Sequence, residues 1–308
     1  MLFIKTFTRS ICTGKYSFAA EKSLLAALRK KTGYTFANCK KALEMHDNDL
    51  NRAELWLKSQ AQALGWSKAT KLEGRHTAQG LIGVAVNQYS GVMVEVNCET
   101  DFVARNKEFQ SMVEDATKCC LRYIESQQKP QENVAKFSLD TEQLKGLHSE
   151  NDGKSLADKL ALMIGTVGEN ATLKQGLGLK TCEGIHLVGY AHPAGHVENG
   201  LQLGKLGGLL AYRSLGEGND HIEIAKGICQ HIVGMRPTKI GNNDDKPAPN
   251  KDEETCLIHQ EYLLDDSVTV KELLEQNQLE IVDFKRLECG EIVSSIGKQP
   301  LEFVETCQ

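Results

Sequence analysis

The chain has 308 residues, of which 25% are charged and 41% hydrophobic, and its formal net charge is −5 at pH 7. This length allows two or three compact units with a real hydrophobic core, and the composition is that of an ordinary soluble protein. Apolar runs stay well short of the roughly 18 residues that a membrane-spanning helix needs. We therefore expect no membrane association.

The first twenty residues carry Lys5, Arg9 and Lys15, several Ser and Thr, and no acid. Basic, hydroxyl-rich and acid-poor segments of this kind are typical of mitochondrial transit peptides, and we predict one at 1–20, with the protein in the mitochondrial matrix. A frayed basic tail is an alternative, and a secretory signal fits less well because charges break the apolar stretch. Without these three cations the net charge of −5 becomes −8, which disfavours direct binding to nucleic acid.

The ten cysteines include no Cys-x-x-Cys pair of the kind that marks zinc and redox sites. Cys119 and Cys120 are neighbours in the sequence, which would strain a disulfide between them. We expect reduced, mostly buried thiols.

Residues 21–66 are predicted to form three short helices. Ser23 opens the first and Gly33 closes it, Thr35 opens the second, and Asp47 or Asp49 opens the third, which Gly65 ends. Short loops require these helices to pack on one another. We place a three-helix domain at 21–72.

The pattern changes after Gly80. The runs 81–87 and 92–98 are β-branched and separated by Gln88-Tyr89-Ser90-Gly91, which predicts an antiparallel hairpin. A helix with an apolar face follows from Asn106, which can cap it. Between strand and helix lies a corner, Thr100-Asp101-Phe102-Val103, where a carboxylate and an aromatic ring are adjacent.

Beyond this helix, 125–153 is predicted as surface loop with some helix, and a helix from Ser155 leads to the glycine-rich 176–178. The plan of two strands and a helix then returns with strands at 185–192 and 206–213 and a helix from Asp220, where Glu223 suggests a capping box. The second copy has Leu-Gly-Glu-Gly at 215–218 in place of the corner.

The remaining elements are a Pro-, Asn- and Asp-rich linker at 241–254, a short helix at about 256–262, a helix from Thr269 with a capping box to Glu272, and a strand at 279–287. We assign 73–180 to a first core subdomain and 181–308 to a second. The fold class is α+β, a three-helix domain followed by a duplicated core of antiparallel hairpins packed with helices.

Catalytic and metal motifs are weak. The segment 200–206 lacks a spacer residue and the Ser or Thr of a phosphate loop. His192 and His196 are four apart, but Pro193 and Gly195 favour a turn. Asp101, with Glu99, could bind Mg²⁺ or act as a base, although two carboxylates are too few for a metal. A plainer alternative is that Asp101 caps the turn and Phe102 packs into the core.

The run from Asn97 to Asn106, Asn-Cys-Glu-Thr-Asp-Phe-Val-Ala-Arg-Asn, closely resembles the signature of the elongation factor Ts family. The segment 28–34, Leu-Arg-Lys-Lys-Thr-Gly-Tyr, resembles the start of that family's ubiquitin-associated-type domain. The resemblance extends from Ser23 to Leu287 and is tightest at 24–58 and 80–115. The sustained heptads of the helical hairpin in bacterial members are absent from the sequence.

The resemblance implies a guanine-nucleotide exchange factor for mitochondrial elongation factor Tu that needs no cofactor or metal and is not an enzyme. In that family Thr100, Asp101, Phe102 and Val103 would enter the GTPase near its Mg²⁺ and phosphate sites. The amino-terminal domain, through Arg29, Lys30, Thr32 and Gly33, would dock on its nucleotide-binding domain. A rival interpretation is a module that recognises ubiquitin-like proteins through 21–66.

Overall fold

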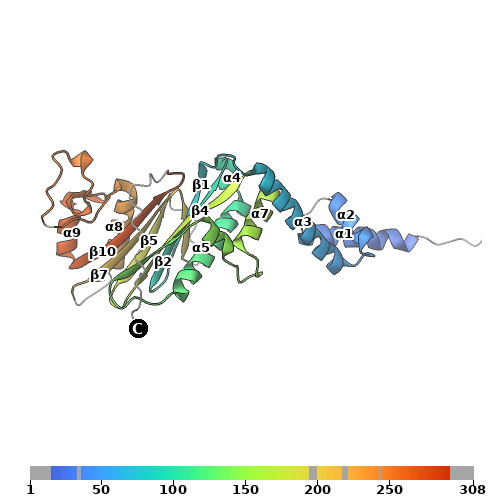
Figure 1. The fold of residues 1–308 in the computed structure, drawn as a ribbon, viewed down its shortest axis with the longest axis horizontal. Coiled ribbons are helices and arrows are strands. Elements are labelled where there is room, and N and C mark those ends of the chain that lie inside the picture. The colour runs from blue at the N-terminus through green and yellow to red at the C-terminus, as the bar shows by residue number, and fades with distance from the viewer. Residues whose placement is uncertain (1–14, 33–35, 194–199, 217–220, 243, 292–308) are drawn as a thin grey trace, which may run out of the picture.

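The computed structural model describes residues 15–32, 36–193, 200–216, 221–242 and 244–291, with the backbone alone for 15–23. The molecule is elongated, with three helices at one end and two packed sheets at the other (Figure 1). Among the described residues, no helix is both long and apolar enough to cross a membrane.

The amino-terminal helices are α1 (Lys15–Thr32), α2 (Phe36–Met45) and α3 (Leu50–Leu72). Their shared core confirms the predicted three-helix arrangement, and consists of Leu28, Cys39, Ala42, Leu43, Ala53 and Leu57. Asp49 caps α3 by accepting the N–H groups of Asn51 and Arg52. The prediction that Ser23 opens the first helix is wrong, because α1 begins at Lys15 in a stretch without Gly or Pro. Thr35 and Gly33 lie outside the described residues.

Gly65 does not end α3, contrary to our expectation, because α3 crosses α7 (Leu156–Val167) at this point. A Cβ on Gly65 would lie 2.5 Å from the carbonyl oxygen of Ala161, and one on Gly165 would lie 2.9 Å from the Gly65 Cα. The glycine therefore permits the two backbones to approach. This packing overrides the roughly 1 kcal/mol by which Gly disfavours a helix interior relative to Ala.

The first sheet contains five strands in the order β3-β4-β2-β1-β6. Its hairpin of β1 (Gln79–Val86) and β2 (Ser90–Cys98) is antiparallel, with Leu81 opposite Val96, which confirms the prediction. The turn is closed by Asn87, whose side chain accepts the N–H groups of Tyr89 and Ser90.

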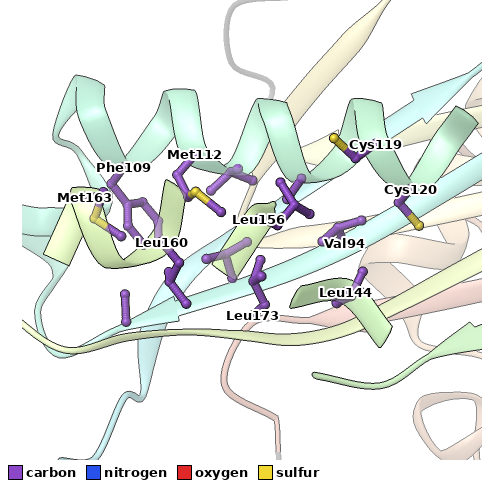
Figure 2. Close-up of a cluster of buried hydrophobic side chains, with 14 of the residues drawn as sticks. Val94, Phe109, Met112, Cys119, Cys120, Leu144, Leu156, Leu160, Met163 and Leu173 are labelled. Carbon is purple, nitrogen blue, oxygen red and sulfur yellow. The ribbon is translucent and has the colours of Figure 1, made fainter. Parts of the chain in front are cut away.

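Helix α5 (Lys107–Ser126), capped by Asn106 as predicted, and α7 cover one face of this sheet. Figure 2 shows Phe109 and Met112 of α5 facing Leu160 and Met163 of α7 over the sheet. Tyr123, near the end of α5, is exposed.

Three strands of the first sheet were missed by the sequence analysis: β3 (Val134–Leu139) and β4 (Ala171–Thr181) in the first segment and β6 (Leu201–Gly204) in the second. The stretch 125–153 therefore contains an edge strand, followed by α6 (Thr141–Gly146). Gly176 and Gly178 lie within β4, where a Cβ on Gly178 would meet Ile124 of α5 at 2.8 Å. These glycines make room for helices rather than form a turn. Strand β6 pairs with β1, so the second segment contributes to the first sheet.

The second sheet has the order β10-β7-β5, from β5 (His186–His192), β7 (Leu206–Ser214) and β10 (Leu279–Glu288). Helix α8 (Ile222–Met235) packs on its outer face, and the inner face packs on the first sheet through Leu187 and Leu209 against Val84 and Met93. The duplicated plan of hairpin and helix is thus confirmed. The Glu223 capping box is not formed, because the helix begins after His221, and Asp220 lies outside the described residues.

The carboxyl-terminal elements are the short 3-10 helices η1 (Lys251–Glu253) and η2 (Leu257–His259), strands β8 (Glu261–Tyr262) and β9 (Asp265–Thr269), and α9 (Val270–Gln276). The capping box of Thr269 and Glu272 is present as predicted. The helix expected at 256–262 is only the single turn η2 followed by β8. Of the ten cysteines, the eight within the described residues form no disulfide.

Candidate functional site

The corner between β2 and α5 is a short helix, α4 (Asp101–Ala104), held at both ends. Thr100 caps it, since its hydroxyl oxygen accepts the Val103 N–H at 3.4 Å. The side chains of Val103 and Ala104 are buried in the core under α5. Local sequence thus fixes this backbone through a Thr cap at one end and an apolar anchor at the other.

Phe102 points away from this anchor and is 79% exposed, the most exposed of the large apolar side chains described. The alternative in which Phe102 packs into the core is therefore wrong, and so is the one in which Asp101 caps the turn, because Thr100 is the cap. An exposed ring on a fixed turn is available for contact with another molecule.

Asp101 lies beside Phe102 and forms an exposed ion pair with Arg105, with 3.0 Å between Oδ2 and Nη2. Exposed pairs of this kind are worth about 0–1 kcal/mol. Asp101 can therefore exchange Arg105 for donors on another molecule at small cost.

Glu99 has different partners from Asp101, as its carboxylate accepts the Asn170 N–H at 2.6 Å and lies 3.6 Å from Arg75. Among the residues that the structure describes, no cluster of three or more His, Cys, Asp or Glu side chains could hold a metal.

The corner's base is tied to two distant segments. The Thr100 hydroxyl donates to Glu169, whose carboxylate oxygens lie 3.0 and 2.9 Å away, and the Asn170 side chain donates to the Arg75 carbonyl at 3.0 Å. We call Arg75, Glu99, Thr100, Glu169 and Asn170 the brace. Sequence reasoning missed Arg75, Glu169 and Asn170, because nothing in the pattern reports contacts about 70 residues apart.

Cys98 adds a further tie to the corner, because its thiol donates to the Thr100 carbonyl at 3.1 Å. Burial is the main cause that raises the pKa of Cys98 to about 12, and burial likewise raises the pKa of Cys120 to about 12. Both thiols are therefore protonated at neutral pH, and protonated thiols are poor nucleophiles.

The second group of predicted contact residues lies at the far end of the molecule. Arg29 and Lys30 are exposed on the last turn of α1. The Thr32 hydroxyl donates a hydrogen bond to the Leu28 carbonyl oxygen at 2.7 Å. Gly33 lies outside the described residues. The structure does not bring this group to the corner, because the 23-residue α3, about 35 Å long at 1.5 Å per residue, lies between them (Figure 1).

The remaining sequence candidates take no part in the corner. Residues 201–204 form strand β6, not a loop before a helix, so the phosphate-loop interpretation is wrong. His192 ends β5 and its Nδ1 lies 3.2 Å from the Tyr190 hydroxyl. His196 lies outside the described residues.

Comparisons with known proteins agree with this geometry. A family model described as the N-terminal part of mitochondrial elongation factor Ts matches residues 8–67, and the elongation factor Ts model matches 99–248 and 249–291. The chain is 60% identical over 276 residues to the mitochondrial elongation factor Ts of Aedes aegypti, covering 88% of this chain and 89% of that protein.

The counterpart in Drosophila melanogaster is 53% identical over 303 residues, covering 94% of each chain. The human counterpart is 41% identical over 276 residues, covering 89% of this chain and 84% of that protein. Together with the capped, ring-bearing corner, these matches show that the chain belongs to the mitochondrial elongation factor Ts family, whose members are nucleotide exchange factors for elongation factor Tu and not enzymes.

Proposed function

We propose that this protein binds mitochondrial elongation factor Tu with GDP in the mitochondrial matrix and promotes GDP release by inserting Thr100–Val103 near the GTPase's Mg²⁺ and phosphate sites. The observation that supports this most strongly is the exposure of Phe102 on a corner that is otherwise anchored. The ring wedges side chains apart beneath the phosphate loop. The Asp101 carboxylate accepts backbone N–H groups in the displaced arrangement and disfavours the Mg²⁺ coordination geometry.

The energetics require more than the corner. Weakening the GTPase's affinity for the nucleotide by a factor of 10⁴ takes about 5.5 kcal/mol. By linkage, the bound nucleotide must weaken the GTPase's affinity for the exchange factor by the same ratio. Burying one Phe contributes only about 1.5–3 kcal/mol. The rest comes from a wide interface that fits the nucleotide-free GTPase better.

We propose that the amino-terminal helices supply part of that interface through Arg29, Lys30, Thr32 and Gly33. Arg29 and Lys30 are solvent-exposed at the end of α1, which suits contact with another protein. They lie a helix length away from the corner, so the two contacts would engage separate parts of the GTPase. Thr32, with its hydroxyl bonded within α1, would contribute its backbone and methyl group.

We also propose residues 1–20 as the import signal, followed by the three-helix domain (21–72) and the two core subdomains (73–180 and 181–308). Support comes from the basic, acid-free composition of 1–20. Helix α1 begins at Lys15, so a cut after residue 20 would shorten it. Amino-terminal sequencing of the protein from mitochondria tests this, and a mature chain that keeps Lys5 and Arg9 would contradict it.

The exchange proposal is tested by stopped-flow release of fluorescent GDP from mitochondrial elongation factor Tu. We expect the wild type to accelerate release and Phe102→Ala to lose tenfold or more, which corresponds to about 1.4 kcal/mol of lost insertion energy. Asp101→Ala should also slow release, because it removes the carboxylate proposed to accept backbone N–H groups of the GTPase, which its exposed pair with Arg105 leaves available. If the wild type leaves the release rate unchanged, the exchange function is wrong for this chain.

A further inference from the structure

The brace joins three segments of the chain at one point under the corner. These are the residues after α3, the end of β2 and the turn after α7, where Gly168 in a left-handed conformation ends the helix. Glu169 and Asn170 follow immediately, and each is bonded to one residue at the corner's base: Glu169 to Thr100 and Asn170 to Glu99. The corner therefore depends on a turn far away in sequence.

A one-turn helix such as α4 is not stable by itself, because fixing its dihedral angles costs more than its few hydrogen bonds return. The exposed Phe102 ring contributes nothing to holding it. A group that inserts into a partner gains affinity when it is fixed in advance, since less conformational entropy is lost on binding. Burial of Val103 and Ala104 holds the end of α4 that follows Phe102, and the Thr100 cap holds the end that precedes it.

We infer that Glu169 is a positioning residue for nucleotide exchange, an inference that rests on the function proposed for the corner. By accepting the hydroxyl proton of Thr100, Glu169 directs the lone pairs of that oxygen to the Val103 N–H. The capped turn then holds α4 in one orientation, with Phe102 aimed outward. In this role Glu169 acts on exchange through Thr100.

Helix α7 separately fastens the amino-terminal domain, and this makes the inference testable. The Trp66 Nε1–H donates to Asp158 Oδ1 at 3.0 Å, and the Lys68 ammonium donates to the Gly165 carbonyl at 2.8 Å. These bonds do not involve Glu169. Loss of its carboxylate should disturb the corner and leave the attachment of α3 intact, so docking and exchange should respond differently.

The experiment measures GDP release across a range of factor concentrations, which separates the maximal rate from the half-saturating concentration. For Glu169→Ala we expect the maximal rate to fall about fivefold or more, in line with the loss of a hydrogen bond to a charged group. The half-saturating concentration should stay within about twofold, because α3 keeps its contacts. Glu142→Ala is the matched control, since it removes a carboxylate that is 80% exposed and paired only with Lys145.

A merely structural role is distinguished by two further variants. Glu169→Gln keeps an oxygen that can accept the Thr100 proton and should recover most of the lost rate. In a Phe102→Ala background, Glu169→Ala should cause no additional loss, since the ring it positions is gone. Thr100→Val, which removes the hydroxyl at nearly constant shape, should reproduce the defect if Glu169→Ala does not fold.

The outcomes separate the inference from the proposed function. If wild type and Phe102→Ala behave as expected but Glu169→Ala matches Glu142→Ala, the positioning role is overturned and the exchange function stands. Additive losses in the double variant would also overturn it. If the wild type does not accelerate release at all, the exchange function fails first.

Discussion

The two copies of the hairpin-and-helix unit share a scaffold but differ where strand passes into helix. In the first copy, β2 leads through a capped turn into α5, and the turn's base is tied by the brace. In the second, β7 leads to Leu215, whose N–H is bonded to the Gln278 carbonyl at 2.8 Å, and α8 begins after His221 without a side-chain cap. The two copies thus share their packing, whereas a capped corner is described in the first copy and 217–220 of the second lie outside the described residues.

Both copies expose an apolar side chain beyond the last strand, Phe102 at 79% and Leu215 at 64%. Exposure alone therefore does not distinguish the copies. Within the described residues, Phe102 lies on a turn that is capped and anchored by buried neighbours, whereas the chain after Gly216 lies outside the part that can be compared. We propose that the corner needs the ring and also a backbone that is fixed before the partner binds.

The largest effect should come from emptying the core under one copy at a time. Phe109→Ala removes a fully buried ring of α5 and should cost about 3–5 kcal/mol of unfolding free energy. Because α5 starts directly after the corner, exchange should fall as well. Ile228→Ala in α8 should cost about 2–5 kcal/mol yet leave the GDP-release rate of the folded fraction close to wild type.

Urea unfolding and stopped-flow release on the same samples measure both effects. If Phe109→Ala and Ile228→Ala slow GDP release equally, the corner depends on the core of the second copy as much as on that of the first. An Ile228→Ala variant that loses as much exchange as Phe102→Ala would contradict the comparison outright.

The copies should also differ in their response to acid. The buried polar group of α5 is Thr117, which does not titrate, whereas that of α8 is His231. The Leu263 N–H donates to Nδ1 of His231 at 3.1 Å, so Nε2 carries the proton and donates to Gln260 Oε1 at 2.9 Å. Burial lowers the pKa of His231, and the bond to Gln260 offsets this only in part.

Because the folded pKa of His231 lies below the ordinary histidine value of 6.5, the unfolded chain takes up the proton first as pH falls. Stability is then fully present above pH 6.5 and is lost below it, by at most about 1.4 kcal/mol per pH unit. Calorimetry at pH 7.5, 6.5 and 5.5 should show this slope in wild type and a shallower one in His231→Gln. Parallel slopes would mean that His231 is not the titrating group.

The amino-terminal caps of α5 and α8 also differ, and the expected effect on stability is smaller. Asn106 accepts the Glu108 N–H at 2.8 Å at the start of α5, whereas His221 makes no such bond for α8. Asn106→Ala should therefore cost about 1 kcal/mol, and His221→Asp should add up to about 1 kcal/mol. Thermal unfolding midpoints measure both shifts. A His221→Asp variant without any gain would indicate that α8 is already capped by another group.

The sequence alone predicted those features that have a local signal. The period-two hairpin at 81–98, the Asn106 cap and the apolar face of α5 all follow from residues near one another, and each is present. Gly65 and β4 were misread for the opposite reason. Gly65 and the glycines of β4 leave space for a residue that is distant in sequence, Ala161 or Ile124, and only the fold brings these residues close.

The candidate site divides in the same way. The corner could be recognised because its four residues are contiguous, but the brace could not, since Arg75, Glu99 and Glu169 belong to three separate segments. A left-handed glycine such as Gly168 indicates a turn after a helix and says nothing of what that turn will touch. Hydrogen bonds between residues that are distant in sequence cannot be predicted from hydrophobic periodicity or capping patterns.

The smallest effect should decide whether the second copy also contacts the GTPase at its corner. Leu215→Ala should change the GDP-release rate by less than about twofold, against tenfold or more for Phe102→Ala, because the support described for Leu215 is one backbone bond to Gln278, whereas Phe102 lies on a capped turn that is fixed before binding. Full burial of a Leu side chain contributes about 1.5–3 kcal/mol, so a tenfold loss in stopped-flow release would mean that Leu215 is inserted too. In that case the duplication would have preserved two working corners, and the brace would matter for aiming Phe102 rather than for making a corner work at all.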